Sequence, residues 1–237
     1  YLPVQRQTFF FAATMPDEIR KLSTEMLKAP ATVEIGIIAP AKTVTHSLYP
    51  STESLKKPLL DAILNHTATG RVLIFTRTKH RAKRLADQLI RSQFRAVALQ
   101  GNMSQNKREQ ALEGFRRGKF DMLVATDVAS RGIDVVHISV VINFDLPDQL
   151  DDYVHRVGRT GRAGREGKAI SFVMPPQKSS IKKLEKLIGT SIALSDSKYS
   201  LKGDIDNLNQ FGRINKKKKK FYSRKKSLKI RNKKNRR

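Results

Sequence analysis

The chain has 237 residues, 39% of them hydrophobic, which suffices for one large domain or for one domain with flanking pieces. The lack of cysteine excludes disulfides and thiolate metal sites, and five scattered histidines argue against a structural zinc. No apolar run reaches the length of a membrane span and no leader resembles a signal peptide, so we expect a cytoplasmic protein that does not bind membranes.

The net charge of +26 is unevenly distributed along the chain. Residues 207–237 hold 15 of the 47 Lys and Arg residues and no acidic residue. Such a segment repels itself and has little apolar surface to bury, so we expect residues 191–237 to form a disordered basic tail. The basic composition of the tail predicts that it binds a polyanion, above all nucleic acid. The alternative is that the tail is a solubilising or targeting segment.

The first thirty residues predict a strand followed by a helix. The chain does not begin with Met, and residues 6–14 have the pattern of a strand inside a domain. A helix is expected from Pro16 to Leu27, because proline at the first helical position and acidic residues in the first turn are favoured. We therefore expect residues 1–30 to be the end of a preceding domain and its linker, within a longer protein.

Residues 31–190 predict a single α/β domain. Beyond two β-like segments at 33–35 and 44–48, short and nearly continuous apolar runs are typical of parallel strands buried on both faces. These runs cover residues 72–75, 97–99, 122–125, 140–142 and 170–173. Helical patterns lie between and after them, at residues 82–90, from Ser104 to about Gly118, at 150–157 and at 181–188.

Strands that alternate with helices predict a doubly wound, mostly parallel sheet with helices on both faces. Ligands of such sheets bind at the carboxyl ends of the strands. Three polar segments follow predicted strands directly, at Thr76–Thr78, Gln100–Ser104 and Thr126–Asp134. We expect the functional site at that edge of the sheet.

Arginines alternate with glycines in residues 155–167, directly after the predicted helix 150–157. Arginine presents a rigid, always-charged fork that matches phosphate oxygens. The glycines let the backbone bend, so that Arg159 and Arg162 can reach one target. The pattern favours a site for clustered anionic oxygens, with a solvated basic loop as the alternative.

Taken together, these segments resemble the C-terminal RecA-like domain of DEAD-box ATP-dependent RNA helicases, within superfamily 2. The resemblance extends from Arg6 to Val173, and its last two elements are long and specific. Residues 72–80 are similar to those of the bacterial RhlE-like subgroup. The matching elements stand in the family's order, as Ala12-Ala13-Thr14, Val72–Thr78, Gln105-x-x-Arg108, Val124–Asp134 and Asp152–Arg162.

For the nucleotide, the resemblance implies that Arg159 and Arg162 are arginine fingers that contact the γ-phosphate of ATP. In phosphoryl transfer such a finger is worth about 10³ to 10⁵ in rate. Asp134 corresponds to the acid that contacts the ribose, in the same segment as Gly132; a helix or loop cap is the alternative for Asp134.

Contacts between domains are implied for four residues. Arg131 and His155 correspond to side chains that bridge to acidic residues of the preceding domain, and Ala13 and Thr14 to an interdomain motif. A local ion pair or a locally bonded histidine is the alternative for Arg131 and His155. Ala12 replaces a serine of the family pattern, which predicts weaker coupling between ATP hydrolysis and strand separation.

For RNA, the resemblance implies contacts to the backbone rather than to the bases, and hence little sequence preference. Capping of strand ends is the alternative for Thr78 and Thr126. The residues with this implied role are Arg77, Thr78, Gly101, Arg108, Thr126 and Asp127.

The chain has no phosphate-loop motif and no Asp-Glu-Ala-Asp motif. We therefore expect ATP and Mg²⁺ to be held mainly by an N-terminal RecA-like domain in cis, and this chain alone to be inactive as an ATPase. The expected partner is single-stranded RNA or a short duplex, and association with ribosomes or ribonucleoproteins is a further expectation. A non-catalytic RNA-binding or annealing module and a DNA helicase of the same superfamily are the alternatives.

Overall fold

A computed structural model describes residues 3, 5–12, 15, 17–33, 43–67, 70–130, 137–174, 177–189 and 192. The chain divides into two compact units, Tyr1–Ile38 and Ala39–Arg237. The predicted basic tail lies outside the described residues, apart from Ile192. None of the helices in the described ranges is long and apolar enough to cross a membrane.

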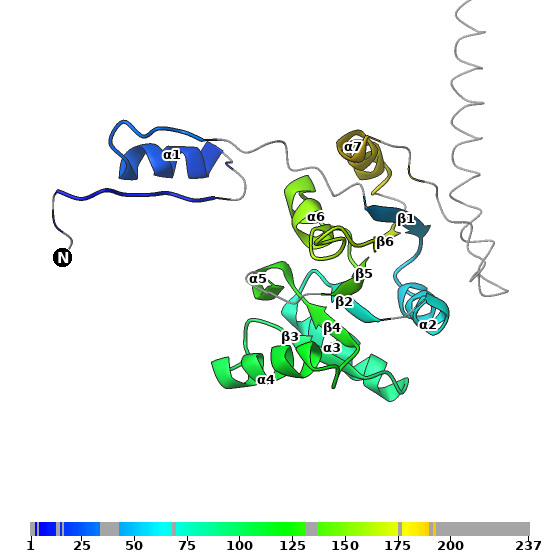
Figure 1. Cartoon of the computed structure of the whole chain (residues 1–237). Coiled ribbons are helices and arrows are strands. Elements are labelled where there is room, and N and C mark those ends of the chain that lie inside the picture. Colours follow the sequence, from blue (N-terminus) through cyan, green and yellow to red (C-terminus); the bar gives the residue numbers. More distant parts are fainter. Residues whose placement is uncertain are drawn as a thin grey trace, which may run out of the picture. The chain divides into compact units, whose positions relative to one another are not determined.

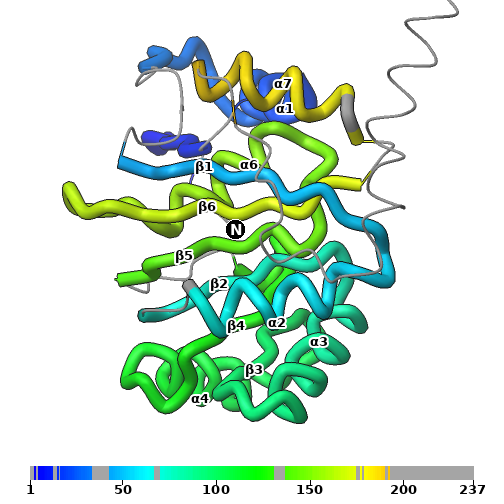
Figure 2. Tube along the Cα trace, turned by 90° about the vertical axis from the view of Figure 1, so that its right-hand side faces the viewer, coloured from blue at the N-terminus to red at the C-terminus, as the bar shows by residue number. Residues whose placement is uncertain are grey.

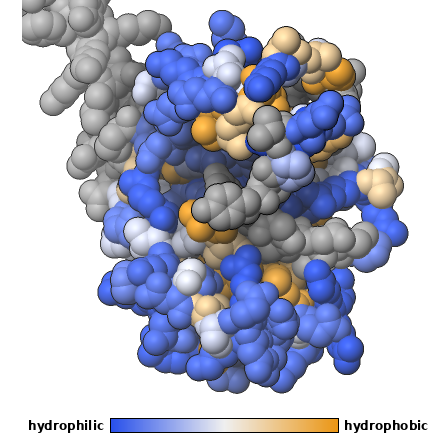
Figure 3. All heavy atoms as spheres, turned by 90° about the vertical axis from the view of Figure 1, so that its left-hand side faces the viewer, coloured by the Kyte–Doolittle hydropathy of each residue, from blue (hydrophilic) through white to orange (hydrophobic). Residues whose placement is uncertain are grey.

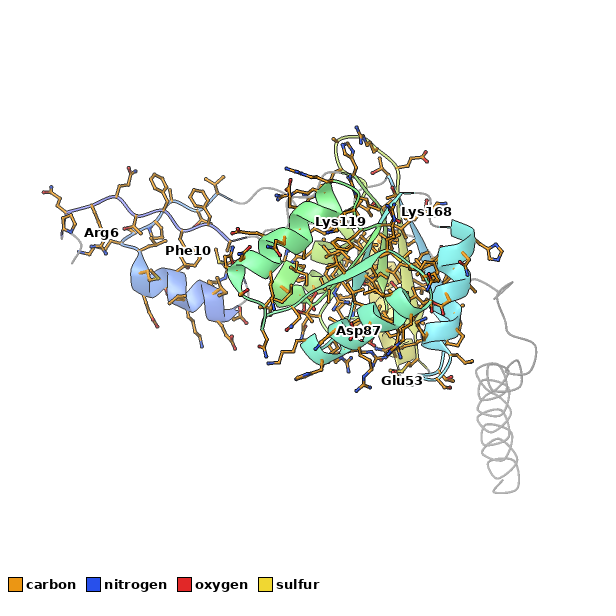
Figure 4. All side chains as sticks on the ribbon, turned by 90° about the horizontal axis from the view of Figure 1, so that it is seen from below. Arg6, Phe10, Glu53, Asp87, Lys119 and Lys168 are labelled. Carbon is orange, nitrogen blue, oxygen red and sulfur yellow. The ribbon has the colours of Figure 1, made fainter. Side chains whose placement is uncertain are left out.

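The first unit contains helix α1 (Asp17–Met26), close to the predicted bounds (Figure 1). Residues 6–12 form no strand, contrary to expectation, because no second strand lies among the described residues of this unit to pair with them. Phe10, labelled in Figure 4, is half-buried, whereas Phe9 and Phe11 are 68% and 89% exposed and stack with ring centroids 6.2 Å apart. Helix α1 buries no side chain. The unit therefore lacks an apolar core among its described residues.

The second unit is built on a six-stranded sheet in which every pairing is parallel (Figure 2). The strand order is β1-β6-β5-β2-β4-β3. The expected doubly wound sheet is confirmed, and each predicted core strand lies within or close to an observed one. The strands are β1 (Val44–Pro50), β2 (Arg71–Phe75), β3 (Ala96–Leu99), β4 (Met122–Ala125), β5 (Ile138–Asn143) and β6 (Gly167–Val173).

Alternate side chains of each strand point to opposite faces of the sheet. Because the core strands are apolar on both faces, helices cover both of them. Val72 and Ile74 of β2 pack with α2 and α3, whereas Leu73 and Phe75 pack with α4 and α5. Helices α6 and α7 cover the second face beside β1 and β6. The helix bounds are α2 (Lys56–Thr67), α3 (Lys79–Arg91), α4 (Gln105–Arg116), α5 (Asp127–Ser130), α6 (Leu150–Val157) and α7 (Lys178–Ile188).

A side-chain cap and glycines mark the ends of two helices, α4 and α6. The Ser104 hydroxyl accepts a hydrogen bond from the backbone N–H of Lys107 and caps α4, as predicted. Gly118, the predicted stop after α4, has φ +78°, a left-handed conformation that glycine adopts without strain. Gly158 ends α6, as expected. Helix α2 was not predicted, although Leu60 and Ile63 form part of its buried stripe.

Candidate RNA- and phosphate-binding site

The segments that follow β5, β2, β4 and β3 lie along one edge of the sheet, because these strands are parallel neighbours in that order. The edge therefore carries Asp145, Thr76–Thr78, Thr126 and Gln100–Gly101, as expected for three of these four segments. Five predicted site residues lie outside the described residues, namely Ala13, Thr14, Arg131, Gly132 and Asp134.

At the end of β2, the two predicted RNA contacts already have partners within the protein. The Arg77 guanidinium donates to the Asp148 carboxylate at 3.0 Å, an exposed ion pair. The Thr78 hydroxyl oxygen accepts a hydrogen bond from the backbone N–H of Arg81 at 3.2 Å, so Thr78 caps helix α3 rather than the end of a strand. Because Thr78 is exposed and the cap uses it as an acceptor, its O–H remains a donor for a phosphate.

At the ends of β3 and β4, the structure brings the other predicted RNA contacts close to the same edge. Gly101 is exposed, and a Cβ placed on it would meet nothing within 4 Å. The half-buried Arg108 donates from Nη2 to the Ala129 carbonyl at 2.5 Å, which ties α4 to α5. Thr126 is 9% exposed. At this part of the edge the exposed group is the Gly101 backbone, since Thr126 is buried and Arg108 is bonded to the Ala129 carbonyl.

The carboxylate of Asp127 is bound to an arginine, a contact that the sequence did not indicate. Both of its carboxylate oxygens accept hydrogen bonds from Arg156 of α6, from Nε at 2.6 Å and from Nη2 at 2.7 Å. A carboxylate would repel phosphate, and here the charge of Asp127 is matched by a guanidinium that is only 3% exposed. An RNA contact at this position would therefore use the backbone, and Arg156 is a site residue that the prediction missed.

A second buried cluster lies at the end of β5 around Asp145. Its carboxylate accepts hydrogen bonds from Lys56 Nζ at 2.6 Å and from the backbone N–H of Arg77 at 3.0 Å, and it forms an ion pair with Arg81 Nε at 3.1 Å. Arg81 also pairs with Glu53, labelled in Figure 4. Lys56 is 1% exposed, so its charge is compensated mainly by Asp145. The cluster fixes the carboxyl end of β2 to the start of α2.

The loop after α6 carries the predicted arginine pair. Its base is held by Thr160, whose hydroxyl donates to the Ile138 carbonyl at 2.6 Å. Gly161 has φ +69°, and a Cβ there would lie 2.5 Å from Cγ2 of Val44, so glycine is required. Arg162 is exposed and donates from Nε to the Gly158 carbonyl at 2.7 Å. These contacts fix the backbone that presents both arginines.

The two guanidinium groups lie close enough to influence each other. Arg159 is half-buried, and burial together with the neighbouring positive charge of Arg162 holds the pKa of Arg159 below its ordinary value. Arginine stays charged at neutral pH in spite of such a shift. The structure thus brings the predicted pair together, and an anion between them would relieve their repulsion.

His155 of α6 has a buried Nε2 atom without a hydrogen-bond partner among the described residues. The alternative of a locally bonded histidine is therefore not realised at this atom. A buried polar nitrogen without a partner is unfavourable.

On the face of the protein drawn in Figure 3, hydrophilic residues predominate and the apolar residues form small separate patches. The described residues hold no group of three or more His, Asp or Glu side chains that could bind a metal ion. The segments after the strands carry arginines, hydroxyls and exposed backbone groups, which suit contacts with phosphates and hydroxyls.

Known proteins share this architecture. Residues 55–164 match the family model described as the helicase conserved C-terminal domain. The chain is 42% identical over 178 residues to the ATP-dependent RNA helicase vasa of Drosophila melanogaster. The matched region covers 75% of this chain and 27% of vasa. It spans 27–40% of the length of three curated relatives that it matches.

Two solved structures are similar to this chain in fold and in sequence. The E. coli DEAD-box protein SrmB, solved with regulator of ribonuclease activity A, has a TM-score of 0.60 and 37% identity, covering 64% of this chain and 90% of the SrmB chain. The S. cerevisiae protein Dbp5, solved with RNA and ADP BeF3, has a TM-score of 0.72 and 28% identity, covering 90% of this chain and 56% of that chain.

Proposed function

The chain belongs to the DEAD-box family of superfamily 2 RNA helicases, as a C-terminal RecA-like domain, and from this we propose that it completes an ATP site and an RNA site whose other halves lie in a preceding domain. The protein that contains both domains is called the full-length protein below. Its proposed activity is ATP-dependent local unwinding of RNA duplexes. Membership of the RhlE-like subgroup and a cytoplasmic location stay predictions.

The observation that carries the proposal is the arginine pair in the loop after α6. Arg159 and Arg162 are close enough for the charge of one to lower the pKa of the other. The loop that holds them is fixed by the buried Thr160 and by Gly161. Such a preorganised pair of forks fits the terminal phosphate of ATP, where negative charge is spread over the equatorial oxygens during transfer.

For RNA, we propose contacts along the sheet edge from Arg77 and Thr78, across Thr126, to Gly101 and Arg108. The support is that Arg77, Thr78, Thr126 and Gly101 directly follow neighbouring parallel strands. Arg108 of α4 is held beside them by its bond to the Ala129 carbonyl. Hydroxyls, backbone groups and arginines of this kind bind phosphates and 2′-hydroxyls without reading bases. Asp127 takes part through its backbone, because its carboxylate is bound to Arg156.

We further propose that an N-terminal RecA-like domain in cis binds ATP and Mg²⁺. In the first unit, Phe9 and Phe11 are exposed and are groups that such a domain would cover. The interdomain role of His155 stays a prediction. The Asp134, Gly132 and Arg131 assignments stay predictions. When bound, ATP supplies the phosphoryl group, and this chain's contribution is to orient and neutralise its terminal phosphate.

The test is the RNA-stimulated ATPase rate of the full-length protein. Arg159→Ala should lower that rate by about 10³-fold or more, while the affinity for RNA changes little. Arg165→Ala is the matched control, since Arg165 is an exposed arginine of the same loop with no proposed role. An unchanged rate for Arg159→Ala would refute the proposal and favour a non-catalytic RNA-binding module.

A further inference from the structure

Arg156 of α6 uses most of its hydrogen-bonding capacity inside the protein. Besides its two bonds to Asp127, it donates from Nη1 to the Asp145 carbonyl at 2.7 Å and to the Asn143 side chain at 3.2 Å. Its guanidinium carbon lies 5.0 Å from the centroid of the Phe75 ring. One side chain thus connects α6 to the ends of β2, β4 and β5.

This connection joins the two proposed sites. Asp127 directly follows Thr126, a proposed RNA contact at the end of β4. On the other side, the backbone N–H of Arg159 donates to the Arg156 carbonyl at 3.1 Å, so the arginine loop continues from Arg156 without a flexible link. A shift of the Thr126–Asp127 segment would therefore be transmitted through the Arg156 fork to the residues that face the nucleotide.

We propose that Arg156 is a positioning residue that couples RNA bound at Thr126–Asp127 to the placement of Arg159. This inference rests on the proposed function above. It assigns Arg156 no contact with RNA or nucleotide.

The geometry explains why arginine is needed here. Only a planar fork can contact both carboxylate oxygens of Asp127 while a further nitrogen reaches the Asp145 carbonyl. Lysine would keep the charge but bind as a single point, so the carboxylate could turn independently of α6. Arg156→Lys therefore removes the rigid link while it preserves the charge.

The chain supplies a matched control for this change. Arg95 forms the same fork with Asp121, from Nε at 2.8 Å and from Nη2 at 2.6 Å, but on the surface, with 61% of its side chain exposed. It connects no proposed contacts. Arg95→Lys thus controls for the loss of an arginine–carboxylate fork as such.

The experiment measures kcat and the half-saturating RNA concentration of the RNA-stimulated ATPase in the full-length protein. Arg156→Lys should lower kcat at saturating RNA by about tenfold or more, as small misplacements of reacting groups do. The half-saturating RNA concentration should change less than about threefold, because the other RNA contacts remain. Arg95→Lys should match the wild type.

Asp127→Asn tests the same link from its other end, because the amide keeps one acceptor oxygen for Arg156 but loses the paired charge, and its side chain is 33% exposed. It should lower kcat with little effect on the half-saturating RNA concentration. The variant Arg156→Lys with Asp127→Asn should be no slower than the slower single variant, since both changes break one link.

A wild-type kcat for both single variants would overturn the inference. So would independent, multiplying effects in the double variant, or a rise only in the half-saturating RNA concentration, which would mean that the Asp127 side chain contacts RNA directly. The variant Arg159→Ala distinguishes a failure of this inference from a failure of the proposed function. If it abolishes turnover while Arg156→Lys and Asp127→Asn do not change it, the inference fails and the proposed function stands; full turnover in Arg159→Ala refutes the proposed function itself.

Discussion

The buried ion pair between Lys56 and Asp145 makes a sharp stability prediction. The two side chains are 2% and 7% exposed, and the Nζ–Oδ1 distance is 2.6 Å. Removing one partner of a buried pair costs about 3–5 kcal/mol, because the other charge is left uncompensated. Lys56→Met leaves Asp145 with a hydrogen bond from the Arg77 backbone and an ion pair with Arg81, so we expect the lower end of that range, about 3 kcal/mol.

For a domain of this size, one kcal/mol corresponds to about 2–4 °C in Tm, so Lys56→Met should lower Tm by about 6–12 °C. Urea unfolding followed by circular dichroism measures the free energy of unfolding directly. Lys57→Met is the matched control. Lys57 pairs with Asp61 on the same helix at 22% and 30% exposure, so its loss should cost about 0.5 kcal/mol or less. Equal losses for the two variants would refute the account of the Asp145 cluster.

Three further predictions concern the surface, the loop and pH. Asp148→Asn should raise RNA affinity about two- to fivefold, because it frees Arg77 from an exposed ion pair. Gly161→Ala should lower the free energy of unfolding by about 2 kcal/mol or more, from left-handed strain plus overlap with Val44. Burial lowers the pKa of His46, so the unfolded chain binds a proton more readily and stability should fall below about pH 6.5.

Each of these predictions has a control. Asp151→Asn removes an exposed acid near the same loop, and an equal rise in RNA affinity would reduce the Asp148 effect to net charge. Gly164→Ala meets the same left-handed strain at φ +73° but no neighbouring atom, so it should cost less than Gly161→Ala in urea unfolding. His46→Gln should flatten the pH dependence of Tm between pH 7 and 5; an unchanged slope would show that another group titrates.

The second unit was predictable where the sequence pattern is local. The apolar positions Leu85 and Leu89 indicate the buried stripe of α3, and the run at 122–125 indicates a buried strand. Helix α5 is only four residues long, too short for a periodic signal. Helix α2 was missed although its stripe, with Pro58 in the first turn, carries a usable helix signal.

The strand expected at residues 6–14 failed for a different reason. Phe9 and Phe11 give the right alternation, but a strand exists only when another strand pairs with it. The described residues of the first unit provide none. Alternation alone therefore predicted the side-chain pattern and not the pairing.

For the site, local motifs indicated the arginine pair and the strand-end segments, but not the contacts between them. Arg156 lies on the apolar stripe of α6 between Tyr153 and Val157, and a charge there is a usable signal for a buried fork. Its partner Asp127 is 29 residues away, and the Lys56–Asp145 pair spans 89 residues. Pairings at such separations depend on the order of strands in the sheet, which no local pattern contains.

The central claim is that Arg159 and Arg162 contact the terminal phosphate of ATP. It is tested most directly by the ratio of the dissociation constants for ADP and for ADP with beryllium fluoride, measured at saturating RNA in the full-length protein. We predict that the double variant Arg159→Ala with Arg162→Ala loses about tenfold or more of the wild-type preference for the fluoride complex, while ADP affinity stays unchanged. An undiminished preference in that variant would contradict the claim.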